Sequence, residues 1–214
     1  ADLLRASVAS ASNDHRLGGY EAPPAVISVF LGDELTDLLT EIETGGKSTI
    51  REGGNLKLGV TTLPNLPKDT SDRNRTSPFA FTGNRFELRA TGSSANCAMP
   101  LIVLNTAVAR ELTIFKNEVD ALVERGVKKD EAILQTIRKF IIESKKVRFE
   151  GNGYSDEWRA EAERRGLRGI ESVASAIKEY IAEENVSLFE EFGVMNRTEL
   201  EARYEIKNET LLKK

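Results

Sequence analysis

The sequence predicts an α+β fold, in which a few strands are followed by a mainly helical region. The composition changes near residue 100, because the part before it holds most of the 16 glycines and all six prolines. These residues mark turns between short elements. The part after it places apolar residues at helical spacing. We therefore expect strand motifs and a polar insert in residues 1–100, and helices of the same domain in residues 101–214.

The first part contains one predicted strand and one predicted helix. Residues 24 to 31 form a β-branched apolar run between prolines and a glycine, which is typical of a buried strand. Asp33 is expected to cap a helix, because the apolar residues after it fall at i, i+3, i+4 and i+7: Leu35, Leu38, Leu39 and Ile42. Gly45 and Gly46 would end this helix. The turn-rich residues 45 to 77 predict a long surface excursion.

Residues 78 to 90 are again typical of a strand, and their alternation separates two kinds of side chain. A period of two places Phe86 and Leu88 on one face. It places three charged residues on the other face: Arg85, Glu87 and Arg89. The ordinary interpretation is a solvated strand face whose charges pair across strands. The functional interpretation is a site in which the three charged side chains converge along one line.

The second part is predicted to form consecutive helices. Between Pro100 and Gly126 the spacing predicts one long amphipathic helix, with its apolar face formed by Leu101, Leu104, Val108, Leu112, Phe115, Val119 and Leu122. A second helix is expected after Asp130. Others are expected to begin near Ser155, near Glu171, and at the capping-box spacings Ser187 to Glu190 and Thr198 to Glu201.

Charge and apolar content argue against several classes of protein. The formal net charge of −4 does not indicate a basic surface for nucleic acid, so we expect no nucleic-acid partner. Any phosphate site must then be a local cluster of arginines. No run of about 18 uninterrupted apolar residues occurs, so no membrane partner is expected. The single cysteine, Cys97, and the absence of a basic-then-apolar leader predict a cytoplasmic protein. Helix-like spacing at both ends of a chain that starts without Met predicts a fragment of a larger protein.

Two local motif matches do not predict a site. Gly46-Lys47-Ser48 resembles the end of a phosphate-binding loop, but that motif needs a glycine where Glu41 stands and a strand where we expect a helix. His15 is the only histidine and Cys97 the only cysteine. This chain therefore cannot assemble a zinc cluster or a cysteine–histidine dyad from its own residues.

Three blocks in a fixed order carry a resemblance to a known family. Residues 16–23 read Arg-Leu-Gly-Gly-Tyr-Glu-Ala-Pro, residues 74–76 read Asn-Arg-Thr, and residues 85–89 read Arg-Phe-Glu-Leu-Arg. Together they resemble glutamine synthetase. The blocks that resemble its large type III branch are residues 11–16, 21–24, 27–32, 77–84 and 151–158. The resemblance covers essentially the whole chain.

The resemblance implies an ATP-dependent ligase. The family activates the γ-carboxylate of glutamate with ATP to give γ-glutamyl phosphate, and ammonia then displaces the phosphate. Arg16 matches the arginine that holds the substrate carboxylate. Glu21 matches the flap glutamate that closes over the site and helps to deprotonate ammonium. Closure matters because water would hydrolyse the acyl phosphate.

The other matched residues concern ATP and its metal. The resemblance implies that Arg75 contacts the transferred phosphate and that Arg85 contacts the nucleotide phosphates. Arg89 would lie at the γ-carboxylate and the phosphate forming on it. Glu87 would ligate the metal at the nucleotide phosphates, where a carboxylate oxygen suits Mg²⁺ or Mn²⁺. The predicted common face of these last three residues agrees with these roles, because phosphoryl transfer needs neutralisation of charge.

The sequence departs from the common pattern of the family in three places. The turn between Arg16 and Glu21 is one residue shorter than in the better-known branch. Ala80 stands where that branch carries another phosphate-binding arginine. An insert from about 33 to 72 separates blocks that elsewhere lie close together. The family's small β-grasp domain, its metal-binding histidine and several metal-binding glutamates precede the point at which this chain begins.

The sequence is therefore expected to form the C-terminal part of a type III catalytic domain, with part of its antiparallel sheet packed by helices. Members of the family assemble as homo-oligomers, dodecamers of two six-membered rings, with active sites between neighbouring subunits. We therefore expect the isolated chain to lack turnover. One alternative is a non-catalytic relative with an assembly or regulatory role, although such a relative would be expected to lack some of the matched residues. Another is an unrelated helical interaction module.

Overall fold

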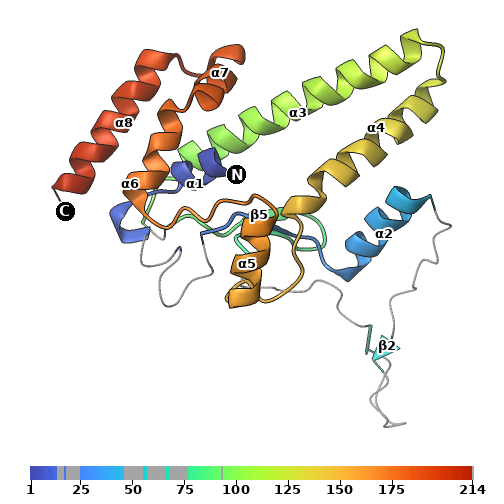
Figure 1. Cartoon of the computed structure of the whole chain (residues 1–214), viewed down its shortest axis with the longest axis horizontal. Helices are drawn as coiled ribbons and strands as arrows, with labels where there is room; N and C mark the ends of the chain where they lie inside the picture. Colours follow the sequence, from blue (N-terminus) through green and yellow to red (C-terminus); the bar gives the residue numbers. More distant parts are fainter. Residues whose placement is uncertain are drawn as a thin grey trace.

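The computed structural model describes residues 1–13, 17, 25–45, 55–56, 66–67, 77–92 and 94–213. Helices dominate these residues, and a three-stranded sheet lies among them (Figure 1). This arrangement agrees with the predicted α+β class.

The three-stranded sheet joins segments that are far apart in the sequence. β1 (Val29–Phe30) pairs in parallel with β4 (Phe79–Phe81), and β4 pairs antiparallel with β5 (Phe86–Leu88). A single bridge between Val29 and Arg148 lies at β1 as well. The sheet is thus mixed, where we expected antiparallel strands. The long connection between β1 and β4 permits their parallel pairing, which a short hairpin loop could not.

β4 and β5 form a hairpin where the alternation predicts a single strand over residues 78 to 90. The chain turns at Gly83, whose φ of 94° is a conformation that glycine adopts easily. The backbone nitrogen of Thr82 donates to the carbonyl of Arg85 at 2.8 Å and closes the turn. A separate antiparallel pair is formed by β2 (Asn55–Leu56) and β3 (Leu66–Pro67).

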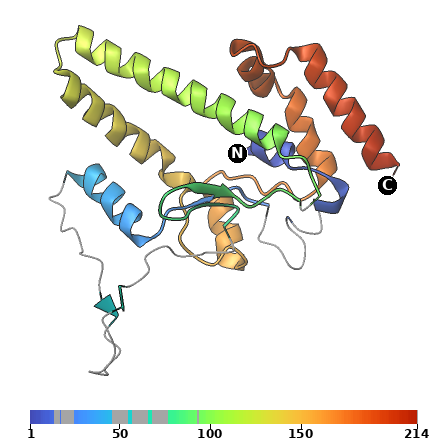
Figure 2. The ribbon, with the colours of Figure 1, turned by 180° about the vertical axis from the view of Figure 1, so that it is seen from behind.

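α3 (Ala98–Glu124) and α4 (Lys129–Glu143) form a helical hairpin that extends away from the sheet in both views (Figures 1 and 2). Phe115 and Phe140 meet edge to face with their ring centroids 5.6 Å apart. Glu118 and Lys139 form an ion pair between the two helices. The long helix predicted from Pro100 is therefore confirmed, and it begins two residues earlier.

The predicted apolar face of α3 is covered only in part. Val119 is buried in the half that faces α4. Leu104 packs against the main core, but the exposed fractions are 52% for Leu101, 54% for Val108 and 62% for Leu112. α4 has 15 residues and α3 has 27, so α4 alone cannot cover the whole stripe. Periodicity identifies an apolar stripe, but it does not reveal how much of that stripe a neighbour covers.

The largest core lies between the N-terminal helix and the last helical segments. α1 (Asp2–Ser7) packs against α3, α6 (Val173–Ala176) and the 3₁₀ helix η3 (Ile177–Ile181). Arg5 is buried in this contact, where its Nε donates to the carbonyl of Ile170 at 2.8 Å. The cluster includes fully buried side chains from residues far along the chain: Ile177, Tyr180, Val186, Phe189 and Leu200.

By length and composition alone, α3 could also cross a membrane. Its most apolar window of 18 residues has a mean hydropathy of 1.4, and 17% of that window is buried. This helix contains no unbroken apolar run of that length, because polar residues such as Asn105 and Arg110 interrupt it. A single such helix is weak evidence for a membrane span, and α3 packs against α1 and α4.

α2 (Asp33–Thr44) contacts α4. Gly45, with a φ of 71°, ends α2 as predicted. Asp33 is the first residue of the helix and makes no capping hydrogen bond, so its predicted capping role is wrong. The preceding Gly32 occupies the cap position with a φ of 83°, which a residue with a side chain adopts only with strain.

Two of the four later helix starts agree with the sequence. α5 (Asp156–Arg164) follows Ser155, whose hydroxyl accepts from the Trp158 nitrogen at 3.2 Å, and α6 follows Ser172 close to the predicted start. The 3₁₀ helix η2 (Ser144–Val147) follows α4.

The two capping-box predictions are wrong. Ser187 lies inside α7 (Glu183–Glu191), which has no side-chain cap that a sequence pattern could reveal. α8 (Arg197–Leu212) begins before Thr198, because Asn196 and Glu199 form the capping box. Asparagine caps helices at least as well as threonine does.

Candidate active site

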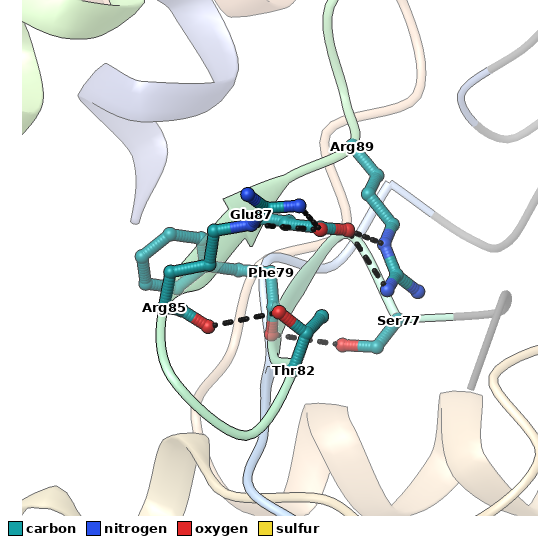
Figure 3. A network of polar contacts seen from close by, with 6 residues as sticks. All are labelled: Ser77, Phe79, Thr82, Arg85, Glu87 and Arg89. Atoms are coloured by element: carbon teal, nitrogen blue, oxygen red, sulfur yellow. Dashed lines mark hydrogen bonds and ion pairs between the residues drawn. The ribbon is translucent and has the colours of Figure 1, made fainter. Parts of the chain in front are cut away.

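The β4–β5 hairpin places the charged residues of the 85–89 block side by side, as the alternation predicts. Figure 3 shows Arg85 and Arg89 on either side of Glu87. Nε and Nη2 of Arg85 lie 3.3 and 3.2 Å from Oε1 of Glu87. Nε and Nη2 of Arg89 lie 3.2 and 3.1 Å from Oε2. Each oxygen of the carboxylate therefore accepts from one guanidinium group.

The strand register explains why these side chains share a face. Glu87 pairs with Ala80, and Phe86 pairs with Phe81. The ring of Phe86 stacks on Phe79 at 5.3 Å between centroids and lies 5.2 Å from the ring of Phe81. Side chains alternate across a strand, so this aromatic contact on one face leaves the other face to Glu87 and its two arginines.

The arginines favour the ionised form of Glu87. The hydrogen bond from Arg89, followed by that from Arg85, holds the pKa of the Glu87 carboxyl below its usual range. Two guanidinium groups and one carboxylate leave the cluster with one net positive charge. Guanidinium groups bind phosphate oxygens in a fork, so the cluster is suited to a phosphate. Arg85 is the most exposed of the three side chains and Arg89 the least.

Glu87 could contribute one ligand to a metal ion. Its carboxylate oxygens have the hard donor character that Mg²⁺ and Mn²⁺ prefer. Within the described ranges, no group of three or more His, Cys, Asp or Glu side chains could hold a metal. The donor chemistry of Glu87 therefore fits such an ion, but further ligands are needed to hold it.

The other predicted site residues, Arg16, Glu21 and Arg75, lie outside the described residues. So do the two other sequence features weighed earlier, His15 and the triplet Gly46-Lys47-Ser48. Cys97 is exposed directly before α3.

The described neighbours of two predicted glutamate-binding residues lie together. Leu17 directly follows Arg16, and it packs in a small buried cluster with Val8 and Ala90. Ala90 directly follows Arg89. The fold therefore brings the segment next to Arg16 against the end of the segment that carries Arg89.

Two long-range contacts, one buried and one half-buried, were not predicted from the sequence. Asn13, at the end of the 3₁₀ helix η1 (Ala11–Asn13), donates to the carbonyl of Ala90 at 2.9 Å. Glu150 accepts hydrogen bonds from the Leu31 and Gly32 nitrogens at 3.1 and 3.0 Å. Both contacts join residues that are more than 70 positions apart, so no local spacing could indicate them.

Comparisons with known proteins agree with the resemblance. Residues 132–214 match the family described as the glutamine synthetase C-terminal domain. A glutamine synthetase of Bacteroides fragilis is 51% identical over 97% of this chain and 29% of its own length. The type-3 glutamine synthetase of Dictyostelium discoideum is 45% identical over 96% of this chain and 28% of its own length. A glutamine synthetase of Butyrivibrio fibrisolvens is 39% identical over 96% of this chain.

The three alignments each cover 96% or 97% of this chain, so they include the hairpin and the helical region that follows it. The chain spans less than a third of the length of these relatives. Because the sequence blocks, the family match and the three relatives all agree, the chain belongs to the glutamine synthetase family and resembles its type III branch.

Proposed function

We propose that this chain acts as the C-terminal part of the catalytic domain of an ATP-dependent glutamate–ammonia ligase. The single observation that carries the proposal is the cluster of Arg85, Glu87 and Arg89 on one face of the hairpin. Two guanidinium groups next to one carboxylate are suited to bind phosphate oxygens and a divalent metal ion together. The non-catalytic alternative would not require this combination.

The proposed binding step is an exchange of partners within the cluster. Oxygens of the nucleotide phosphates would take over the guanidinium group of Arg85. The γ-carboxylate of glutamate and the phosphate forming on it would take over that of Arg89, and the carboxylate of Glu87 would be released. Glu87 would then be free to supply an oxygen ligand to Mg²⁺ or Mn²⁺. A bound cation would neutralise charge on the nucleotide phosphates, and the arginines would stabilise charge on the phosphoryl group during transfer.

The remaining roles rest on the resemblance. Arg16 would hold the carboxylate of glutamate, and Arg75 would contact the transferred phosphate. Glu21 would close over the site and take a proton from ammonium. Glutamate, ammonium and ATP are accordingly the proposed substrates.

We also propose the cytoplasm as the compartment and a homo-oligomer, a dodecamer as in the family, as the working form. The working form would include chain beyond these residues, since relatives of this chain are more than three times as long.

The test is the substitution Glu87→Ala in the full-length protein that contains this chain. Glu161→Ala is the matched control, because Glu161 also lies between two arginines, Arg164 and Arg165, but on α5. We expect Glu87→Ala to weaken Mn²⁺ binding in the presence of ATP and to lower glutamine formation by roughly a hundredfold or more, in line with loss of electrostatic stabilisation. The control should retain both properties.

Mn²⁺ binding can be followed by the paramagnetic signal of the free ion, and folding by circular dichroism. A Glu87→Ala protein that binds Mn²⁺ and forms glutamine like its parent would show that the cluster is only a structural ion pair.

A further inference from the structure

Asn13 is a buried polar residue that joins two segments of the proposed site. Its side chain is 1% exposed. Its Nδ2 donates to the carbonyl of Val8 at 2.7 Å and to the carbonyl of Ala90 at 2.9 Å. The first bond closes the chain around η1, and the second reaches the residue directly after Arg89. One amide group therefore connects the N-terminal segment to the residues that directly follow the β4–β5 hairpin.

The backbone of Asn13 makes a third connection. Its carbonyl accepts from the Leu17 nitrogen at 2.8 Å, and Leu17 follows directly on Arg16. The Leu17 side chain packs against Val8 and Ala90 in the buried cluster beneath these hydrogen bonds. Asn13 and this cluster thus hold residues on both sides of Arg16 in the sequence to the residue that follows Arg89.

The amide of Asn13 acts here as a donor. Its Oδ1 has no hydrogen-bond partner in the part of the chain that the structure describes. Both protons of Nδ2 are directed to backbone carbonyls, as two bonds to two different segments require. A buried carbonyl that loses its donor is costly, so these two bonds restrict the relative position of the segments. An apolar side chain of similar size could fill the space but could not make either bond.

We propose that Asn13 is a positioning residue for glutamate binding, because it fixes the spacing between the segments that carry Arg16 and Arg89. This inference rests on the proposed function, in which both arginines contact glutamate. Asn13 has no assigned contact with the substrate and would act through these two residues. Its loss should therefore weaken the use of glutamate while the nucleotide part of the site changes little.

The experiment compares two substitutions in the full-length protein, Asn13→Ala and Asn185→Ala. Asn185 is the matched control, because it is also buried and its Nδ2 donates to a backbone carbonyl, that of Glu179, at 2.8 Å. It lies on α7 and packs on η3, outside the hairpin. Steady-state rates give KM for glutamate and for ATP, and thermal unfolding gives the melting temperature of each variant.

We expect Asn13→Ala, which removes both hydrogen bonds of Nδ2, to raise KM for glutamate roughly tenfold, with a much smaller change in KM for ATP and in kcat. Asn185→Ala should lower the melting temperature without changing KM for glutamate. Asn13→Ser keeps one hydroxyl donor for two carbonyls, so its KM for glutamate should fall between those of the parent and Asn13→Ala. If Asn13→Ala does not fold, the same comparison is made with Asn13→Ser.

Three results would overturn the proposal while leaving the ligase function intact. One is an unchanged KM for glutamate in the Asn13 variants. Another is an equal rise in the KM values for glutamate and ATP, which would indicate a general loss of structure. The third is a similar rise in the Asn185 control. Failure of the ligase proposal is distinct, since the parent protein itself would then form no glutamine.

Discussion

Glu87 combines two properties at the scale of a single residue. It is an oxygen donor suited to a metal, yet both of its oxygens accept from arginines. The arginines differ in their setting, because Arg89 is much less exposed than Arg85. Solvent screens an exposed ion pair strongly, so Arg89 should dominate the electrostatic effect on Glu87. Hydrogen bonding by Arg89 is also the largest cause of the lowered pKa of Glu87.

This difference predicts how the two arginine substitutions change the titration of Glu87. The pKa of the carboxyl should rise toward its ordinary value in Arg89→Ala and rise less in Arg85→Ala. As the pH falls, the carboxylate with the higher pKa is protonated first. In Arg89→Ala, protons should therefore begin to compete with a cation for Glu87 at a higher pH than in the parent protein. The measurement is a titration of the Glu side-chain carbons by NMR, with Glu87→Gln used to assign the signal. Equal shifts in the two variants would contradict the dominance of Arg89.

At the scale of elements, local spacing predicts the type of an element better than its ends. The periodicity of residues 100 to 126 identifies α3, and the alternation around Glu87 identifies β5 and its charged face. The sequence pattern places the cap of α8 two residues too late, because Thr198 to Glu201 matches a capping box as well as Asn196 to Glu199 does. The asparagine side chain accepts from the Glu199 nitrogen at 2.9 Å, and Glu199 accepts from the Asn196 nitrogen at 2.9 Å.

The two competing caps of α8 can be distinguished by substitution. Asn196→Ala should destabilise the helix by about 1 kcal/mol, because it leaves a first-turn nitrogen without its acceptor. Thr198→Ala is the matched control and should change stability by no more than about 0.5 kcal/mol, as is usual for an exposed site. Hydrogen exchange of the first turn of α8 and the melting temperature report both effects. A larger loss in Thr198→Ala would reinstate the cap that the sequence pattern favours.

At the scale of the whole molecule, sequence reasoning finds the family and the charged cluster but not the contacts that assemble the site. The resemblance names Arg16 and Arg89 as substrate-binding residues, and only the fold reveals that Asn13 joins their neighbourhoods. Long-range hydrogen bonds have no period in the sequence, so they cannot be predicted from spacing. The exposed part of the α3 stripe has the same cause, because coverage depends on which distant elements pack on the helix.

The number of metal ligands that the chain supplies determines whether it can be active alone. Mg²⁺ prefers six oxygen ligands in near-octahedral geometry, and in the proposed site Glu87 would supply one of them. No group of three or more His, Cys, Asp or Glu side chains that could hold a metal lies in the described ranges. We therefore expect the isolated chain to form no glutamine from glutamate, ammonium, ATP and Mg²⁺, whereas the full-length protein that contains it should be active. The measurement is glutamine released by each protein at equal molar concentration, with circular dichroism to establish that the isolated chain is folded. Turnover by the isolated chain within the usual enzyme range of roughly 1 to 10³ s⁻¹ would mean that these residues hold a complete metal site, and the ligands would then have to be sought among residues outside the described ranges.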